Sequence, residues 1–161
     1  MKRVLVYRHA KTEKAGDNMA DFVREITDVG ERQARSIGKL LAGEELLPEL
    51  ILSSDAVRAV QTAELTAEEA GYDGEIREQE ELYGADAKDY ITVLRQQDDT
   101  YSTLMIVGHN PAIEDLLESL LGRHEKMKTG WIAELELSVD SWEQLGASGE
   151  ITIKRTLKPE T

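Results

Sequence analysis

The chain has 161 residues, with 32 acidic and 19 basic side chains, a formal net charge of -13 at pH 7, and no cysteine. This length suits one domain, residues 1–161, with a sizeable core, and the lack of cysteine excludes disulfides, cysteine-based phosphatase chemistry and cysteine zinc sites. The negative charge argues against nucleic acid or an anionic membrane as a general partner, because phosphate backbones are bound by basic surfaces.

The N-terminal stretch MKRVLVYRHA contains an apolar run of only four residues, Val4 to Tyr7, and no small-residue cleavage site follows it. It is therefore not a signal peptide, and no other stretch approaches the roughly 18 apolar residues that would span a membrane. We expect a cytoplasmic protein. The unbroken apolar run predicts a first strand that is covered on both faces, as in a parallel sheet.

The rest of the chain alternates between short apolar runs, which predict strands, and segments with apolar residues at helical spacing. Residues 11–25 show no sustained period, and 15–18 are typical of a loop. The predicted helices span 27–43, 56–70, 87–97 and 111–122, and the further predicted strands span 48–54, 75–78, 102–108, 131–139 and 150–157. The last two strands alternate apolar and polar residues, which indicates half-exposed strands. The pattern predicts an α/β fold, a three-layer sandwich whose mainly parallel central sheet carries helices on both faces.

Two of the three histidines stand at the ends of predicted strands. Arg8 and His9 follow the first strand, and His109 follows a later one after Gly108. Ligands of open parallel sheets bind beyond the carboxyl ends of the strands, so we expect these side chains to meet there. The helix that begins near Pro111 is expected to aim unpaired N–H groups at the same crevice, which favours an anion.

Arg58 lies in the first turn of the helix that follows the second strand, where its charge opposes the helix dipole. A ligand explains this arginine better than helix stability does. A single histidine at a strand end is most often structural, and Arg58 alone is as easily a surface residue, but the combination favours a site. His124 is expected in a solvated loop.

Two histidines and two arginines, without a thiol or a metal motif, suit phosphoryl transfer. A neutral imidazole is a nucleophile near neutral pH when its other nitrogen is held as a donor. Guanidinium groups and a second, protonated imidazole match the charge that spreads over the transferred oxygens. A carboxyl group from a nearby loop is expected to protonate the leaving group. No metal and no cofactor is called for.

Five segments, in order, resemble the histidine phosphatase superfamily, and most closely its SixA-like phosphohistidine phosphatases. These are VYRHAKT, DFVREITDVGERQA, ILSSDAVRAVQTAEL, ELYGAD and LMIVGHNPAIEDLL, which together cover nearly the whole chain. The resemblance implies a phosphoglycerate mutase-like fold. It also implies that His9 is the nucleophile, that Arg8 and Arg58 bind the phosphoryl group, that His109 completes the phosphate pocket, and that Arg24 lies near it.

The resemblance leaves the proton donor open. Larger relatives place a glutamate three residues before the loop tyrosine, which puts Glu80 in this position relative to Tyr83, with Glu81 beside it. Short SixA-like proteins do not always keep this arrangement, so Asp21 is a rival.

The resemblance therefore implies a metal-independent phosphatase that works through phosphohistidine on His9. Its expected partner is a phosphorylated protein, such as the phosphohistidine of a signalling phosphotransfer domain. A small phosphomonoester fits the same residues. The third interpretation is an inactive phosphate-binding or interaction module, against which the nucleophilic imidazole argues, since a phosphate binder needs only the arginines.

Overall fold

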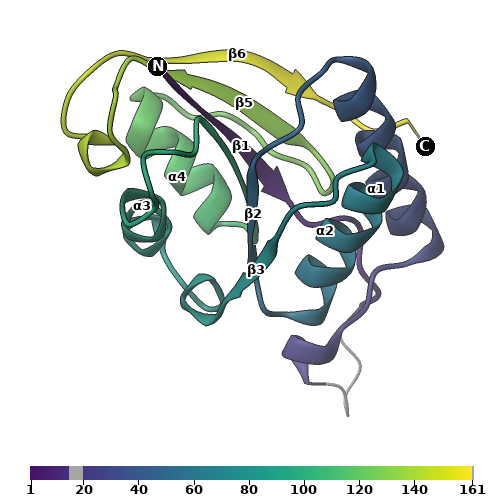
Figure 1. The fold of residues 1–161 in the computed structure, drawn as a ribbon. Helices are drawn as coiled ribbons and strands as arrows, with labels where there is room; N and C mark the ends of the chain where they lie inside the picture. The colour runs from purple at the N-terminus through teal and green to yellow at the C-terminus, as the bar shows by residue number, and fades with distance from the viewer. Residues whose placement is uncertain (15–19, 161) are drawn as a thin grey trace.

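The computed structural model describes residues 1–14 and 20–160, which form a six-stranded sheet between two layers of helices (Figure 1). The strand order is β3-β2-β4-β1-β5-β6. Four neighbouring strands are parallel: β1 (Lys2–Arg8), β2 (Leu50–Ser54), β3 (Ile76–Gln79) and β4 (Thr103–Gly108). Strand β5 (Ile132–Leu137) runs antiparallel to β1, and β6 (Ile151–Leu157) runs antiparallel to β5. The predicted α/β sandwich with a mainly parallel sheet is confirmed.

Helices cover both faces of the sheet. In Figure 1, α1 (Asp28–Gly43) and α2 (Val57–Ala70) lie on one face, and α3 (Ala87–Arg95) and α4 (Ala112–Leu121) on the other. Short 3₁₀ turns occupy Asp21–Val23, Glu80–Leu82 and Trp142–Gln144. The loop expected at 15–18 lies outside the described residues, and the single domain stays a prediction.

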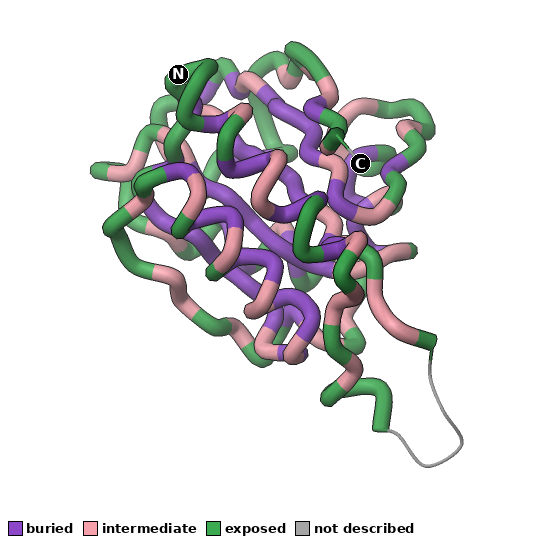
Figure 2. The backbone as a smooth tube through the Cα atoms, turned by 90° about the vertical axis from the view of Figure 1, so that its right-hand side faces the viewer, coloured by how far each residue is buried: buried purple, intermediate pink, exposed green. Residues whose placement is uncertain are grey.

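Strand β1 shows how the apolar runs build two cores. Val4 and Val6 pack toward α3 and α4, while Leu5 and Tyr7 pack toward α1 and α2, because successive side chains of a strand point to opposite faces. All four are fully buried. Figure 2 shows the same pattern across the molecule, with buried backbone concentrated in the central strands and on the inward sides of the helices.

Strand β5 differs from the expectation of half exposure. It lies between β1 and β6, and even its polar residue Glu134 is only 2% exposed. This carboxylate is compensated by Arg3 from β1, at 3.0 Å, and by Arg155 from β6, at 2.7 Å. The polar residue in the alternating pattern of β5 is therefore buried and ion-paired. A buried carboxylate is tolerated when cations pair with it.

The parallel strands bring distant residues to one edge of the sheet. Strands β1, β2 and β4 all end at this carboxyl edge, where Arg8 lies in register with Gly108. Within residues 1–14 and 20–160, no helix has both the length and the apolar composition that crossing a bilayer would take.

Candidate active site

The two strand-end histidines meet at the carboxyl edge although a hundred positions separate them. The backbone N–H of His9 donates to the carbonyl of Gly108 at 3.0 Å, and the ring centroids of His9 and His109 lie 5.2 Å apart. Arg58, only 6% exposed, comes to the same edge from the first turn of α2. The convergence of Arg8, His9, His109 and Arg58 follows from parallel strands ending together.

The ring of His9 is held in one tautomer. Its Nδ1 lies 2.8 Å from the carbonyl of Ala10, and because a carbonyl only accepts, Nδ1 carries the proton and Nε2 keeps its lone pair. The N–H of Ala10 is in turn held by the hydroxyl of Thr62. Burial, together with the charges of Arg58 and Arg8, lowers the pKa of His9 to about 4. His9 is therefore a neutral imidazole with a free Nε2 at neutral pH.

The ring of His109 is oriented the opposite way. Its Nε2 lies 2.7 Å from the hydroxyl of Ser54, which also accepts the N–H of Ala56 at 3.2 Å. The Ser54 hydroxyl keeps a second lone pair as well as its proton, so it can donate to Nε2 or accept from it. Donation to Nε2 places the His109 proton on Nδ1, which has no hydrogen-bond partner among the described residues. Burial, His9 and Arg58 lower the pKa of His109 to about 3. His109 is thus neutral near pH 7, whereas the sequence predicts a protonated imidazole at this position, and with Ser54 donating to Nε2 it offers an Nδ1–H donor.

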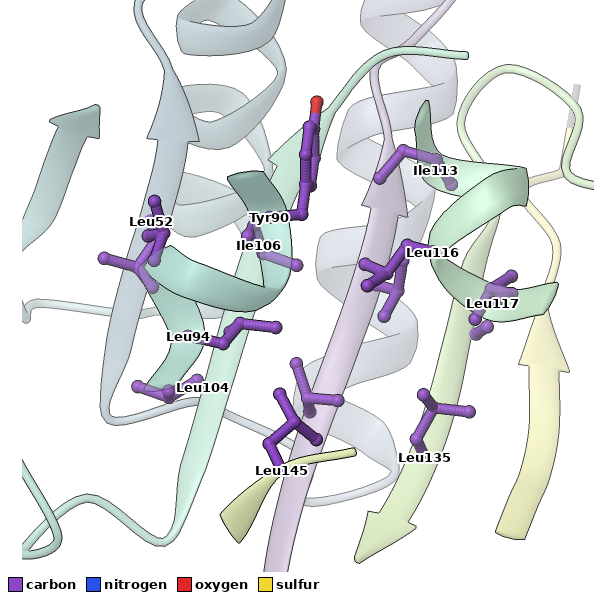
Figure 3. Close-up of a cluster of buried hydrophobic side chains, with 14 of the residues drawn as sticks. Leu52, Tyr90, Leu94, Leu104, Ile106, Ile113, Leu116, Leu117, Leu135 and Leu145 are labelled. Atoms are coloured by element: carbon purple, nitrogen blue, oxygen red, sulfur yellow. The ribbon is translucent and has the colours of Figure 1, made fainter. Parts of the chain in front are cut away.

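Tyr90 fixes the backbone of His109. Its hydroxyl accepts the N–H of His109 at 3.1 Å and donates to the carbonyl of Leu82 at 3.2 Å. Figure 3 shows the tyrosine standing in the core with its oxygen toward the carboxyl edge of the sheet. A side chain at Gly108 would overlap the Tyr90 ring, so glycine is required by this close approach. Burial raises the pKa of Tyr90 to about 12, which keeps its hydroxyl protonated.

Three nitrogens around His9 are buried without a hydrogen-bond partner among the described residues: Nε of Arg8, Nε of Arg58 and Nδ1 of His109. The remaining bonds of the arginines set their direction. Arg8 Nη1 donates to the carbonyl of Met127 at 2.9 Å, and Arg58 donates to the Asp21 carbonyl at 2.8 Å and carboxylate at 3.0 Å. Buried donors without acceptors are costly, and an oxyanion beside His9 would satisfy them.

Asp21 brings a carboxylate to the two arginines Arg24 and Arg58. It accepts the hydroxyl of Tyr83 at 2.7 Å and a guanidinium nitrogen of Arg24 at 2.8 Å, in addition to Arg58. These bonds, that of Tyr83 foremost, hold the pKa of Asp21 well below its usual range. Asp21 is therefore held as a carboxylate and carries no proton to donate near neutral pH.

A cleft of about 260 Å³ opens beside His109, with Asp21, Arg58, Tyr83 and Pro111 in its walls. His9 is not among its lining residues, and its ring centroid lies 5.2 Å from that of His109, which is one of them. The ring of Tyr83 lies edge-on to His109, with centroids 5.8 Å apart. The cleft can therefore accept a small group next to the two imidazoles.

The glutamates expected as proton donors lie elsewhere. Glu80 and Glu81, in the Glu80–Leu82 turn, are exposed and do not line the cleft. Arg24 does not line it either, and reaches it through its bond to Asp21. His124 is exposed, in agreement with the expectation of a solvated loop.

The N-terminus of α4 corrects another expectation. The N–H of Ile113 is bonded to the His109 carbonyl at 2.8 Å, and that of Glu114 to the Asn110 side chain at 3.3 Å. These two groups are not available to an anion. Pro111 precedes the helix as its N-cap and is not in its first turn. Anion affinity at this edge therefore depends chiefly on side chains.

Sequence reasoning missed Ser54 and Tyr90. The serine pair that closes β2 was visible in the sequence, but only the packing shows that the second serine reaches His109. In the sequence, Tyr90 fits the apolar pattern of the helix predicted at 87–97. No sequence signal marks its hydroxyl as the partner of His109, which is 19 positions away.

Comparisons with known proteins identify the family of this chain. Residues 4–92, more than half of the chain, match the family model of the histidine phosphatase superfamily (branch 1). An uncharacterized chloroplastic protein of Arabidopsis thaliana is 30% identical over 154 residues, which cover 89% of this chain and 70% of that protein.

Solved structures share the fold over nearly the whole chain. A protein assigned as phosphohistidine phosphatase SixA, from Agrobacterium tumefaciens, superposes with a TM-score of 0.85 at 28% identity and 98% coverage of both chains. The protein histidine phosphatase SixA complexed with tungstate gives a TM-score of 0.83 at 23% identity, covering 98% of this chain and 97% of that one. The chain belongs to the histidine phosphatase superfamily, in its SixA-like branch, and is a phosphatase.

Proposed function

We propose that this phosphatase hydrolyses phosphohistidine on proteins and that the phosphoryl group passes through His9. The free Nε2 of His9, the unpartnered nitrogens of Arg8, Arg58 and His109, and the ionised state of Asp21 support this proposal. The SixA structure from Agrobacterium tumefaciens carries the same activity in its assigned name.

In the first step, Nε2 of His9 attacks phosphorus while the bond from phosphorus to the substrate's leaving atom breaks. The lone pair of Nε2 becomes the new N–P bond, and the electrons of the broken bond go to the leaving group. Negative charge on the transferred oxygens is bound by Nε–H of Arg8 and Arg58 and by Nδ1–H of His109. Because these donors are already in place, little reorganisation accompanies the transfer.

The observation that carries the substrate class is the state of the carboxylates. Asp21 is held ionised by Tyr83, Arg24 and Arg58, and Glu80 is a solvent-exposed side chain of the Glu80–Leu82 turn. When an alkyl phosphate is hydrolysed, the alcohol leaves as an alkoxide unless a proton donor is present. An alkoxide is about as basic as hydroxide, since the pKa of water is about 15.7, so this reaction needs a proton donor. Phosphohistidine needs no proton donor from the enzyme. Its other ring nitrogen, with a pKa of about 6.5 as in histidine, takes a proton from solvent, and the side chain then leaves as neutral imidazole.

In the second step, water adds to the phosphorus of phospho-His9, and the N–P bond electrons return to Nε2. The protons of the water end on phosphate and solvent, which restores the neutral ring with its proton on Nδ1. The Ala10 carbonyl holds that proton throughout both steps.

The test compares leaving groups. We expect rapid hydrolysis of phosphohistidine and of p-nitrophenyl phosphate, whose phenolate is a good leaving group, and at least about 100-fold slower hydrolysis of phosphoserine. Equal rates on phosphoserine would overturn the assignment in favour of a general phosphomonoesterase. Acid quenching should destroy, and alkaline quenching preserve, a phosphate on His9. His9→Ala should abolish turnover, and a fully active His9→Ala would refute the mechanism.

A further inference from the structure

Resting on the proposed function, we propose that Lys128, Trp131 and Lys158 form a docking surface for acidic protein segments that flank the phosphohistidine. We call these three residues the lysine–tryptophan rim. The proposal concerns a contact outside the phosphate pocket, and therefore the choice of phosphoprotein.

Two residues of the rim, Lys128 and Trp131, lie in the loop that holds Arg8 and His9. The carbonyl of Met127 accepts Nη1 of Arg8 at 2.9 Å, and the N–H of Gly130 is shared by the carbonyls of Arg8 and His9, at 3.1 and 3.0 Å. The carbonyl of Trp131 accepts the N–H of Arg8 at 3.1 Å. Lys128 and Trp131 are thus displayed by the same short segment that holds Arg8 and His9, so a protein bound at His9 extends over them.

Lys158 joins this surface from the other end of the chain. It follows β6, whose last residue, Leu157, is paired with Ile132 beside Trp131. The Nζ of Lys158 lies 4.6 Å from the centroid of the Trp131 ring, and that of Lys128 lies 5.8 Å from it. Both lysines are exposed and the tryptophan is half-buried. The ring therefore holds two ammonium groups together at the surface.

The charge of the rim is not cancelled within the part of the chain described here. No carboxylate of residues 1–14 or 20–160 is within ion-pair distance of Lys128 or Lys158, although the chain has 32 acidic residues. A further exposed lysine, Lys11, lies close by, since its N–H is bonded to Gln33, whose side chain also borders Gly130. Unpaired cations beside the nucleophile of a chain of net charge -13 favour an acidic partner, because complementary charge steers and selects encounters.

The test uses two peptides that differ only in charge. Each carries one phosphohistidine, flanked on both sides by two glutamates in one peptide and by two glutamines in the other. Free N-phosphohistidine is the small substrate. For the wild type we expect kcat/KM to be about tenfold higher on the glutamate peptide at low salt, since exposed ion pairs are individually weak. The preference should disappear near 1 M salt, where the Debye length is about 3 Å.

The variant is Lys128→Glu with Lys158→Glu. We expect it to lose the preference for the glutamate peptide while hydrolysing free phosphohistidine at the wild-type rate. The matched control is Arg95→Glu with Arg123→Glu, which changes the net charge equally at the C-terminal end of α3 and just after the C-terminal end of α4, and it should keep the preference.

The outcomes separate the two proposals. If both double variants hydrolyse all three substrates and keep the same preference for the glutamate peptide, the docking role of the rim is refuted. An equal loss of preference in both would also overturn it, because total charge would then be the cause. No hydrolysis of any substrate by the wild type would overturn the proposed function and the rim with it.

Discussion

Replacing Ser54 with alanine tests whether His109 acts as a neutral donor. The Ser54 hydroxyl lies 2.7 Å from Nε2 of His109, and we expect it to donate to Nε2 and so to place the His109 proton on Nδ1. In Ser54→Ala, Nε2 has no hydroxyl partner, and the ring is free to carry its proton on the wrong nitrogen. The Nδ1–H donor to the phosphoryl oxygens would then be lost in part of the molecules.

The expected magnitude follows from the burial of this bond. Ser54 is fully buried and His109 is half-buried, so leaving Nε2 without its partner costs about 1–3 kcal/mol. At about 1.4 kcal/mol per factor of ten, this is roughly a 5- to 150-fold loss in kcat/KM. The loss should lie mainly in kcat, since charge on the transferred oxygens is greatest in the transition state.

The adjacent serine provides a matched control. Ser53 is equally buried, and its hydroxyl donates to the carbonyl of Ser54 at 2.9 Å without a contact to His109. Ser53→Ala should lower the free energy of unfolding by an amount similar to Ser54→Ala, about 1 kcal/mol, while kcat stays within about threefold of the wild type. Thermal unfolding measures the first quantity and phosphohistidine hydrolysis the second.

Nitrogen chemical shifts of the His109 ring report the tautomer directly. The wild type should show the proton on Nδ1, and Ser54→Ala a mixture of both tautomers. A wild-type ring protonated on Nε2, or equal kcat values for the two alanine variants, would refute the role assigned to Ser54.

The remaining predictions concern the protonation of the nucleophile, the packing behind it and the carboxylates. Because burial and neighbouring cations lower the pKa of His9 to about 4, its ring nitrogens should show no titration between pH 8 and 5; a midpoint near 6.5 would contradict a buried neutral ring. Gly108→Ala should lower the free energy of unfolding by about 1–3 kcal/mol, measured in urea, because the new methyl group overlaps Tyr90, and it should be unaffected only if that ring can move away. Glu80→Gln should hydrolyse phosphohistidine within about threefold of the wild-type rate, and a large loss of kcat would identify that glutamate as the proton donor. Asp21→Asn should alter KM, because it releases a guanidinium nitrogen of Arg58.

The residues that sequence predicts best are those whose position depends only on the sheet. His9 and His109 each follow an unbroken apolar run, and parallel strands must end at a common edge, so their meeting was predictable without knowing any packing detail. Arg58 was predictable for a related reason, since a cation in the first turn of a helix is unfavourable without an anion.

The residues that sequence could not predict depend on side chains crossing between elements. Tyr90 looks like one more apolar residue of α3, yet its hydroxyl ends 3.1 Å from the N–H of His109. Asp21 lies in a segment without periodicity, and its place is set by Arg58 from α2 and Tyr83 from the next loop. Glu80 was favoured by its spacing from Tyr83, but spacing along a turn does not decide which side chain faces the cleft.

The charges of the site explain why both imidazoles stay available for chemistry. Arginine guanidinium groups stay charged near neutral pH, and the charges of Arg8 and Arg58, added to burial, lower the pKa of His9 and keep its ring neutral. A second imidazolium in place of either arginine would gain and lose its proton near neutral pH, and the affinity for phosphate would vary with it. Positive charge is thus carried by groups that do not titrate, and nucleophilicity by a group that has already lost its proton. In a chain of net charge -13, this local cluster draws a phosphoryl group to His9, while the acidic remainder of the surface repels phosphate elsewhere.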